Sequence, residues 1–223
     1  MSPPLIEVYD RLLKRYGPQA WWPGQTPFEV MVGAILVQNT NWRNVERAIE
    51  NLREEGLLTP NALYQASSGD LEELIRPAGY FRVKAKRLRN LLTWLHDRYD
   101  GSLEAMFETS VDTLREELLA VHGIGPETAD AILLYAGGMP VFVVDAYAHR
   151  VLARHGWIDA DADYYRIQEV FVESLPADAV MFNEYHALLV RVGKEHCKPT
   201  PLCEGCPLCE LLPEGGPLGR EDF

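Results

Sequence analysis

The sequence contains 223 residues, 47% of them hydrophobic and 24% charged, which is enough for one large domain or two small ones that share a core. No apolar run approaches the roughly 20 residues of a membrane-spanning helix, and residues 1–17 lack the apolar core of a signal peptide. The net charge of −12 excludes a uniformly basic surface, so a nucleic acid could bind only where cations gather locally.

Helical periodicity runs through the chain, and no strand alternation persists. Apolar residues recur at helical spacing from Leu5 to Leu13, and residues 27–38 are apolar on nearly all sides, as in a helix buried within a bundle. Asn41 is a candidate N-cap for the helix that follows. The predicted fold is all-α, with further helices near residues 60–67, 70–76, 83–98, 111–121, 126–137, 145–155, 164–174 and 181–195.

One segment predicts two helices joined by a tight turn. The first helix ends near Val121 and the second starts at Pro126, with Gly123 and Gly125 between them. Two glycines one residue apart allow positive φ and leave backbone N–H groups uncovered. Pro126 suits the first helical position, and Glu127 suits the positive end of the helix dipole. Uncovered amides beside a helix N-terminus form an anion site, here sized for a DNA backbone phosphate.

The longer string, hydrophobic-x-Gly-hydrophobic-Gly-x-x-Thr-Ala, resembles the helix-hairpin-helix motif of DNA repair proteins. That resemblance adds Thr128 to Gly123 and Gly125 as contacts to DNA. A Gly/Pro-rich loop then leads to Asp145 in a Val-Asp context, as in the endonuclease III superfamily of DNA glycosylases. An acidic residue that opens a helix is usually only an N-cap, but together with the hairpin the resemblance implies a catalytic Asp145.

The four cysteines lie close together near the end of the chain, as Cys197-x5-Cys203-x2-Cys206-x2-Cys209. Three cysteines at successive x2 spacings wrap a compact iron–sulfur cluster, and a fourth thiolate completes its binding. Zinc, the alternative, usually prefers two separated Cys-x2-Cys pairs, and so dense a group suits two unstrained disulfides poorly. The pattern favours a [4Fe–4S] cluster in a reducing compartment.

The cysteine layout also resembles the C-terminal cluster of endonuclease III. The family's usual spacing is Cys-x6-Cys-x2-Cys-x5-Cys, so the first gap here is one residue shorter and the last three residues shorter. A cluster in this place has no obvious catalytic role. The resemblance implies that it holds Lys194, Lys198 and the local backbone against DNA phosphates.

The resemblance covers nearly the whole chain. By position, Asn39 and Tyr80 correspond to side chains that fill the gap left by a base flipped out of the duplex. The helix after Tyr80 corresponds to a basic helix that presses on DNA. A basic cluster alone is more often an ordinary solvated face, but this resemblance places Lys84, Lys86 and Arg87 on the DNA side.

Two departures from endonuclease III point to chemistry and substrate. Bifunctional family members have a lysine two residues after the second glycine, and its amine forms an imine with the sugar. This chain has Glu127 there, and a carboxylate cannot form an imine.

Tryptophan is by default a core residue, but Trp21, Trp22 and Trp42 flank the first barrel helix. Trp-Trp-Pro with a glutamate resembles the endonuclease III-like 3-methyladenine glycosylases. A base alkylated at a ring nitrogen carries positive charge, and stacking against an indole favours a cation.

These observations predict two helical lobes: residues 28–139 with the hairpin, and residues 1–27 with 140–223, which carry the cluster loop 197–209. The predicted function is hydrolytic release of alkylated purines from double-stranded DNA by a cytoplasmic monomer, associated with the nucleoid in a prokaryote, with Asp145 and Glu127 in the catalytic site. The alternatives are an oxidised-pyrimidine glycosylase and a DNA-structure binder without turnover, which the acidic net charge favours. The histidines His149, His155 and His186 are expected to be structural or to lie on the surface.

Overall fold

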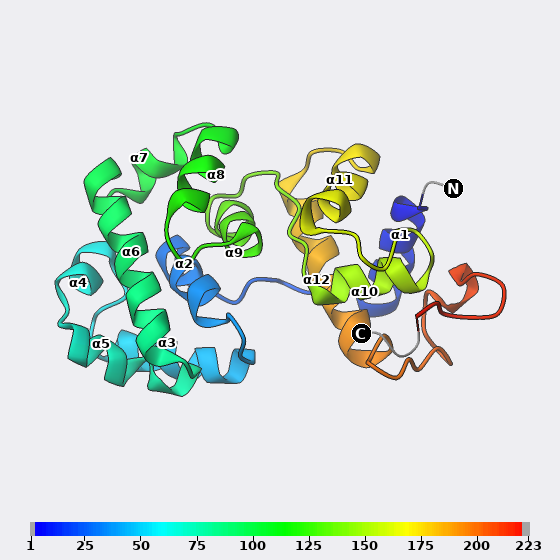
Figure 1. Ribbon diagram of the computed structural model, residues 1–223, viewed down its shortest axis with the longest axis horizontal. Helices are drawn as coiled ribbons and strands as arrows, with labels where there is room; N and C mark the ends of the chain where they lie inside the picture. The colour runs from blue at the N-terminus through cyan, green and yellow to red at the C-terminus, as the bar shows by residue number, and fades with distance from the viewer. Residues whose placement is uncertain (1–2, 220–223) are drawn as a thin grey trace. The chain divides into compact units, whose positions relative to one another are not determined.

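The computed structural model describes residues 3–219, which contain helices, turns and loops but no strand (Figure 1). The chain divides into two compact units, residues 22–139 and residues 1–21 with 140–223. None of the helices in the described part of the chain is long and apolar enough to span a bilayer.

The unit of residues 22–139 is built around a central apolar helix, α2. Every residue of α2 from Phe28 to Leu36 is buried, because the helix packs against α3, α6, α9 and the π-helical turn η2. Thr26 caps α2, and Asn41 caps α3 as predicted, accepting from the amide of Asn44 at 3.2 Å. The elements are α2 (Pro27–Leu36), α3 (Trp42–Glu54), α4 (Pro60–Gln65), α5 (Ser68–Leu74), η1 (Arg76–Ala78), α6 (Phe81–Tyr99), α7 (Leu103–Phe107), α8 (Val111–Ala120), α9 (Pro126–Ala131) and η2 (Ile132–Ala136).

This unit begins at Trp22, six residues before the boundary expected from the sequence. The reason is local packing: the Trp22 ring lies 5.0 Å from Trp42 and 5.1 Å from Tyr135, both in the same unit. The short helix α7 has no counterpart among the predicted helices, since five residues give too little periodicity to detect.

The other unit packs α12 against α1 and α10. An aromatic core joins distant parts of the chain: Phe142 stacks on Phe171 at 3.8 Å, and the hydroxyl of Tyr185 donates to the carbonyl of Leu5 at 2.8 Å. The described elements are α1 (Leu5–Tyr16), α10 (Ala146–Arg154), α11 (Tyr164–Ser174), α12 (Ala179–Glu195) and the short 3₁₀ turn η3 (Cys209–Leu211).

Candidate functional site

The predicted hairpin joins α8 to α9, and its two glycines do different things. Gly123 has φ +99°, and a Cβ there would lie 2.4 Å from Cγ of Arg87, so both the backbone angle and the space require glycine. Gly125 was expected to need positive φ as well, but its φ is −97° and nothing lies within 4 Å of its missing Cβ. The role of Gly125 is therefore to leave the backbone amides at the start of α9 without a covering side chain, and the turn itself does not need a glycine at this position.

The carbonyl groups of the hairpin are held against its own unit. The Asn90 side chain donates to the carbonyl of His122 at 2.8 Å, and Nε2 of Gln38 donates to the carbonyl of Gly123 at 3.3 Å. No side chain caps α9, whose first amides have no partner within the helix by geometry. The carbonyl oxygens of the turn are therefore held by hydrogen bonds, and the backbone N–H groups at the start of α9 remain available to an anion.

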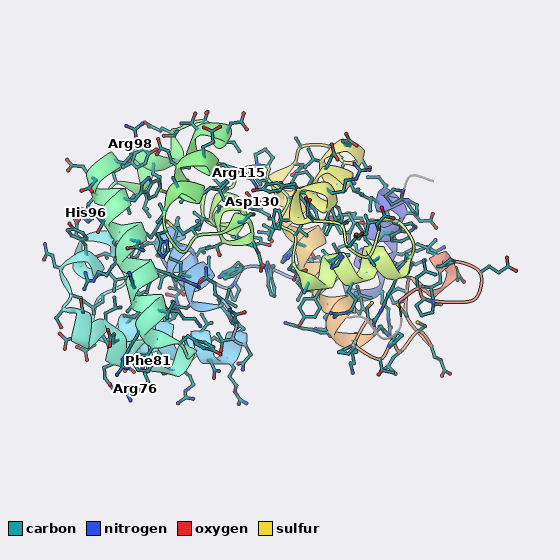
Figure 2. All side chains as sticks on the ribbon, viewed as in Figure 1. Arg76, Phe81, His96, Arg98, Arg115 and Asp130 are labelled. Carbon is teal, nitrogen blue, oxygen red and sulfur yellow. The ribbon has the colours of Figure 1, made fainter. Side chains whose placement is uncertain are left out.

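A buried ion pair ties the two hairpin helices together. Arg115 on α8 donates to both oxygens of Asp130 on α9, at 2.6 and 3.0 Å, and Asp130 is completely buried (Figure 2). Neither residue is predicted from the local sequence to have a role in the site. Bidentate geometry fixes the angle between the partners, so this pair sets how the hairpin presents its turn.

Thr128 was predicted to contact DNA, but it lies inside the unit. Its side chain is 7% exposed, and its hydroxyl accepts from Nε2 of Gln38 at 2.9 Å. Thr128 therefore fastens the hairpin to the loop after α2. Glu127, in contrast, is exposed in the first turn of α9, where the resemblance places a lysine in bifunctional enzymes.

The basic helix α6 uses most of its cations internally, which corrects the prediction for Lys84. Lys84 is 1% exposed, and its Nζ donates to the carbonyls of Leu36 at 2.8 Å and Ala78 at 2.7 Å. Burial, aided by the charge of Arg87, lowers the pKa of Lys84 to about 8. Such a lysine cannot reach a phosphate.

Other cations of α6 are also engaged. Arg87 donates to Oε1 of Gln38, and Arg89 donates to carbonyls of the segment 63–66. Lys86 and Arg82 are exposed, although Arg82 lies 3.7 Å from Glu72. Of the three cations of α6 that were predicted to contact DNA, Lys86 is the one that is exposed in the described structure, whereas Lys84 and Arg87 donate to groups of their own unit. Lys84 was mispredicted because periodicity does not show which neighbour a buried cation meets.

Asn39 and Tyr80 share an unusual backbone. Their φ angles are +53° and +46°, in the left-handed region that a bulky residue such as tyrosine rarely adopts. Both are exposed, Tyr80 to 72%. Strained exposed residues of this kind concentrate at functional sites.

Trp22 and Trp42 form one wall of a pocket. Their rings lie 5.0 Å apart at 86°, and Gly33 of α2 lies against both indoles, where a Cβ would be 3.5–3.6 Å away. The pocket has a volume of about 240 Å³ and is lined, besides the tryptophans, by the carboxylates Glu29, Glu46 and Glu50 and by Pro23, Gly24, Ile49 and Arg53. Arg53 pairs with Glu29 at 3.1 Å and also with Glu50, so it is the aromatic faces that suit a cationic ligand. Trp21, predicted to act with these two, belongs to the other unit.

In that other unit, Asp145 opens α10. Its Oδ1 accepts from the amide of Ala148 at 2.8 Å, and its Oδ2 lies 3.5 Å from Nε2 of His186. The side chain is 13% exposed. Burial raises the pKa of Asp145, but His186 and the amides of Tyr147 and Ala148 outweigh it and bring the pKa below its usual value. Asp145 is thus both an N-cap and an ionised carboxylate at neutral pH.

The proximity of His186 to Asp145 does not follow from the sequence, which predicts only a structural or surface role for His186. His186 is 5% exposed on the buried face of α12, between Phe182 and Leu189. A titratable residue on an apolar helix face was the available signal. His155 bonds the carbonyls of Val151 and Leu208, which confirms its predicted structural role.

Trp21 and Lys194 lie near the same helix start. Nζ of Lys194 is 5.9 Å from the ring centres of both Trp21 and Tyr147, and the Trp21 ring is 6.4 Å from His186. A Cβ on Gly193 would clash with Tyr147, which shows how closely α12 approaches α10 there. Lys194 is exposed, as is Lys198 in the loop that follows α12.

The four cysteines line one pocket and form no disulfide. Arg154 is 1% exposed, and it donates to Sγ of Cys197 at 3.3 Å and to the carbonyls of Lys198 and Pro199. Burial raises the pKa of the Cys206 thiol to about 11. No three His, Cys, Asp or Glu side chains among residues 3–219 lie as a single ion would require.

Comparisons with known proteins agree on one family. The signature of HhH-GPD superfamily base excision DNA repair proteins matches residues 32–177, which include the hairpin and Asp145. A provisionally named DNA repair glycosylase of Methanocaldococcus jannaschii is 48% identical over 93% of this chain and 94% of its own length. Endonuclease III of Thermotoga maritima is 33% identical over 85% of each chain.

Solved structures give the same result. The H. pylori 3-methyladenine DNA glycosylase (MagIII) bound to 1,N6-ethenoadenine superposes with a TM-score of 0.73 at 28% identity, covering 86% of this chain and 97% of the other. A non-covalent endonuclease III–DNA complex superposes with a TM-score of 0.80 at 26% identity, covering 95% and 94%.

Proposed function

The chain belongs to the HhH-GPD superfamily of base excision DNA repair proteins, and on that premise we propose that this DNA glycosylase is monofunctional and releases alkylated purines such as 3-methyladenine. The observation that carries the proposal is Glu127, exposed in the first turn of α9. An imine requires an amine, so a carboxylate there closes the lyase route and leaves hydrolysis.

Asp145 supplies the charge that hydrolysis needs. Its Oδ1 is committed to the cap of α10 and its Oδ2 faces His186, so the carboxylate is held in one orientation. An ionised carboxylate can orient or deprotonate a water molecule and stabilise the positive charge that grows on the sugar. A base alkylated at a ring nitrogen already carries positive charge, so it leaves without being protonated by the enzyme.

The pocket beside Trp22 and Trp42 supports a cationic base as the substrate. Two indoles line a volume suited to a purine-sized ligand rather than to a large one. Two of the three carboxylates pair with Arg53, so the attraction for a cationic base comes from the indoles. DNA would be held by the uncovered amides at Gly125 and α9 and by exposed cations such as Lys86, Lys194 and Lys198. We expect one monomer to act on each damaged site.

The cysteine pocket supports a [4Fe–4S] cluster. Four thiolates that bind four different irons stand farther apart than the four ligands of one zinc ion, whose sulfurs all lie about 2.3 Å from the metal. All four cysteines line one pocket, so their thiolates can converge on one cluster. Cys197, Cys203, Cys206 and Cys209 would hold the cluster, and Arg154 would donate to the Cys197 thiolate. When bound, the cluster would contribute folding energy to this unit.

Base release from defined duplexes tests the proposed function. Duplexes carrying 3-methyladenine, an oxidised pyrimidine or no lesion should be incubated with the protein, and free bases measured. We expect release from the methylated duplex alone. Release of the oxidised pyrimidine would instead support the alternative substrate, and binding without any release would support a DNA-structure binder.

Trp42→Ala should impair release of charged bases more than neutral ones. Removing one indole loses a cation–π interaction of about 1–2 kcal/mol, or roughly 5- to 30-fold in rate, for 3-methyladenine but not for neutral hypoxanthine. Trp94→Ala, which removes another half-buried indole of the same unit, is the matched control and should leave the ratio of the two rates unchanged. Equal losses for both bases would show that Trp42 serves packing only.

Borohydride should trap no covalent complex with DNA above background, because Glu127 cannot form an imine. The measurement is a denaturing gel of labelled duplex treated with enzyme and reductant, with a bifunctional endonuclease III as positive control. Glu127→Lys should introduce weak trapping. Efficient trapping by the unchanged protein would mean that another lysine serves as nucleophile, and the monofunctional assignment would be withdrawn.

A further inference from the structure

Lys84 connects two separate chain segments through one ammonium group. Its Nζ donates to the carbonyl of Leu36, the last residue of α2, and to the carbonyl of Ala78, the last residue of η1. Asn39 follows the first of these carbonyls by three residues, and Tyr80 follows the second by two. Asn39 and Tyr80, two of the four exposed non-glycine residues with positive φ among residues 3–219, thus emerge from loops anchored to the same nitrogen atom.

Two further side chains of α6 extend this arrangement to the hairpin. Arg87 holds Gln38, which neighbours Asn39 and itself donates to the carbonyl of Gly123. Asn90 donates to the carbonyl of His122. These side chains follow Lys84 at three-residue intervals, so one face of α6 contacts all three loops.

An apolar side chain at the position of Lys84 would avoid the cost of burying a charge but would leave the carbonyls of Leu36 and Ala78 without this donor. Burial of the ammonium lowers the pKa of Lys84 to about 8, so the folded state disfavours the charged form. A hydrocarbon chain has no such penalty, but it cannot donate to two carbonyls from different segments. Lysine is useful at this position because one ammonium group fixes the distance between the two segments.

We propose that Lys84 is a positioning residue that holds the loops of Asn39 and Tyr80 in one fixed spacing, and that Arg87 and Asn90 align the hairpin with them. The inference rests on the proposed function, in which Asn39 and Tyr80 occupy the gap left by the extruded base. Left-handed backbone is unfavourable for Tyr80 and tolerated by Asn39, and the anchored flanking carbonyls hold both loops in that conformation. The three loops then meet DNA as one preorganised surface.

Lys84→Met tests this inference, with Arg89→Met as the matched control. Both variants remove a cation of α6 that bonds backbone carbonyls, but Arg89 holds segment 63–66 rather than the DNA loops. Base extrusion is followed by the fluorescence of 2-aminopurine placed next to the lesion, which rises when the neighbouring base leaves the stack, and the chemical step by single-turnover release of 3-methyladenine. Binding to undamaged duplex and thermal unfolding are measured in parallel.

We expect Lys84→Met to abolish most of the fluorescence rise and to slow single-turnover release by about tenfold to a hundredfold, the scale of small misplacements. Affinity for undamaged DNA should stay within about twofold, since no phosphate contact is removed. Lys84→Gln, which retains two uncharged donors, should recover part of the fluorescence and guards against misfolding of the methionine variant. Arg89→Met should extrude the base like the unchanged protein.

Two outcomes would overturn the inference, and they differ in whether the proposed function is also contradicted. If Lys84→Met extrudes the base normally while Tyr80→Ala does not, Lys84 does not position the loops and the proposed function stands. If Asn39→Ala and Tyr80→Ala both extrude the base normally, the loops have no role in extrusion, so that part of the proposed function fails together with the inference.

Discussion

Asp145→Asn should lower the rate of base release by about a hundredfold or more, the scale expected when a positioned general base is lost. Asparagine keeps the Oδ1 acceptor that caps α10, so the fold should be unaffected, but it loses the charge that would stabilise the sugar cation. The measurement is single-turnover release of 3-methyladenine together with binding to DNA that carries an abasic site. Binding should persist or tighten slightly, because a negative charge near the phosphates is removed.

Asp163→Asn is the matched control. Asp163 caps α11 as Asp145 caps α10, accepting from the amide of Arg166 at 2.9 Å. Its replacement should leave both turnover and stability nearly unchanged. If Asp145→Asn also retained near-normal turnover, Asp145 would be a cap and nothing more, and the DNA-binding alternative would become the better account of this protein.

Cys203→Ser should remove the cluster and destabilise the unit that contains α1, α10, α11 and α12. We expect the unchanged protein, purified without oxygen, to be brown and to contain about four irons per chain, as a [4Fe–4S] cluster requires. The serine variant should be colourless and unfold at lower temperature, since cluster binding is part of the folding energy. The loop that accepts hydrogen bonds from buried Arg154 would lose its anchor, leaving that cation poorly compensated.

Glu204→Ser is the control for this change, because Glu204 is an exposed neighbour of Cys203 in the same loop and is not a predicted ligand. It should keep both iron and stability. Metal analysis that found one zinc and no iron in the unchanged protein would replace the cluster with a zinc site, and would do so without affecting the assignments of Glu127 or Asp145.

Local sequence patterns determined most of the helices and the places where chemistry could occur. Apolar periodicity predicted the buried helix α2, and Asn41 predicted the start of α3. The pair Gly123 and Gly125 predicted the hairpin. Asp145 was placed correctly at a helix start. These features depend on neighbours within a few residues, because helix periodicity, caps and turns are set by hydrogen bonds between residues close in the chain.

Tertiary structure decided what each of these residues touches. The sequence predicted Lys84 and Thr128 to contact DNA. In the structure, Lys84 donates to the carbonyls of Leu36 and Ala78, and the hydroxyl of Thr128 accepts from Gln38. His186 lies beside Asp145 although forty residues separate them in the chain. Adjacent tryptophans go to different units because Trp22 packs on Trp42 and Tyr135. Such contacts follow from how helices pack, and a buried cation or histidine has the same local pattern whether it meets a carbonyl, a carboxylate or a ligand.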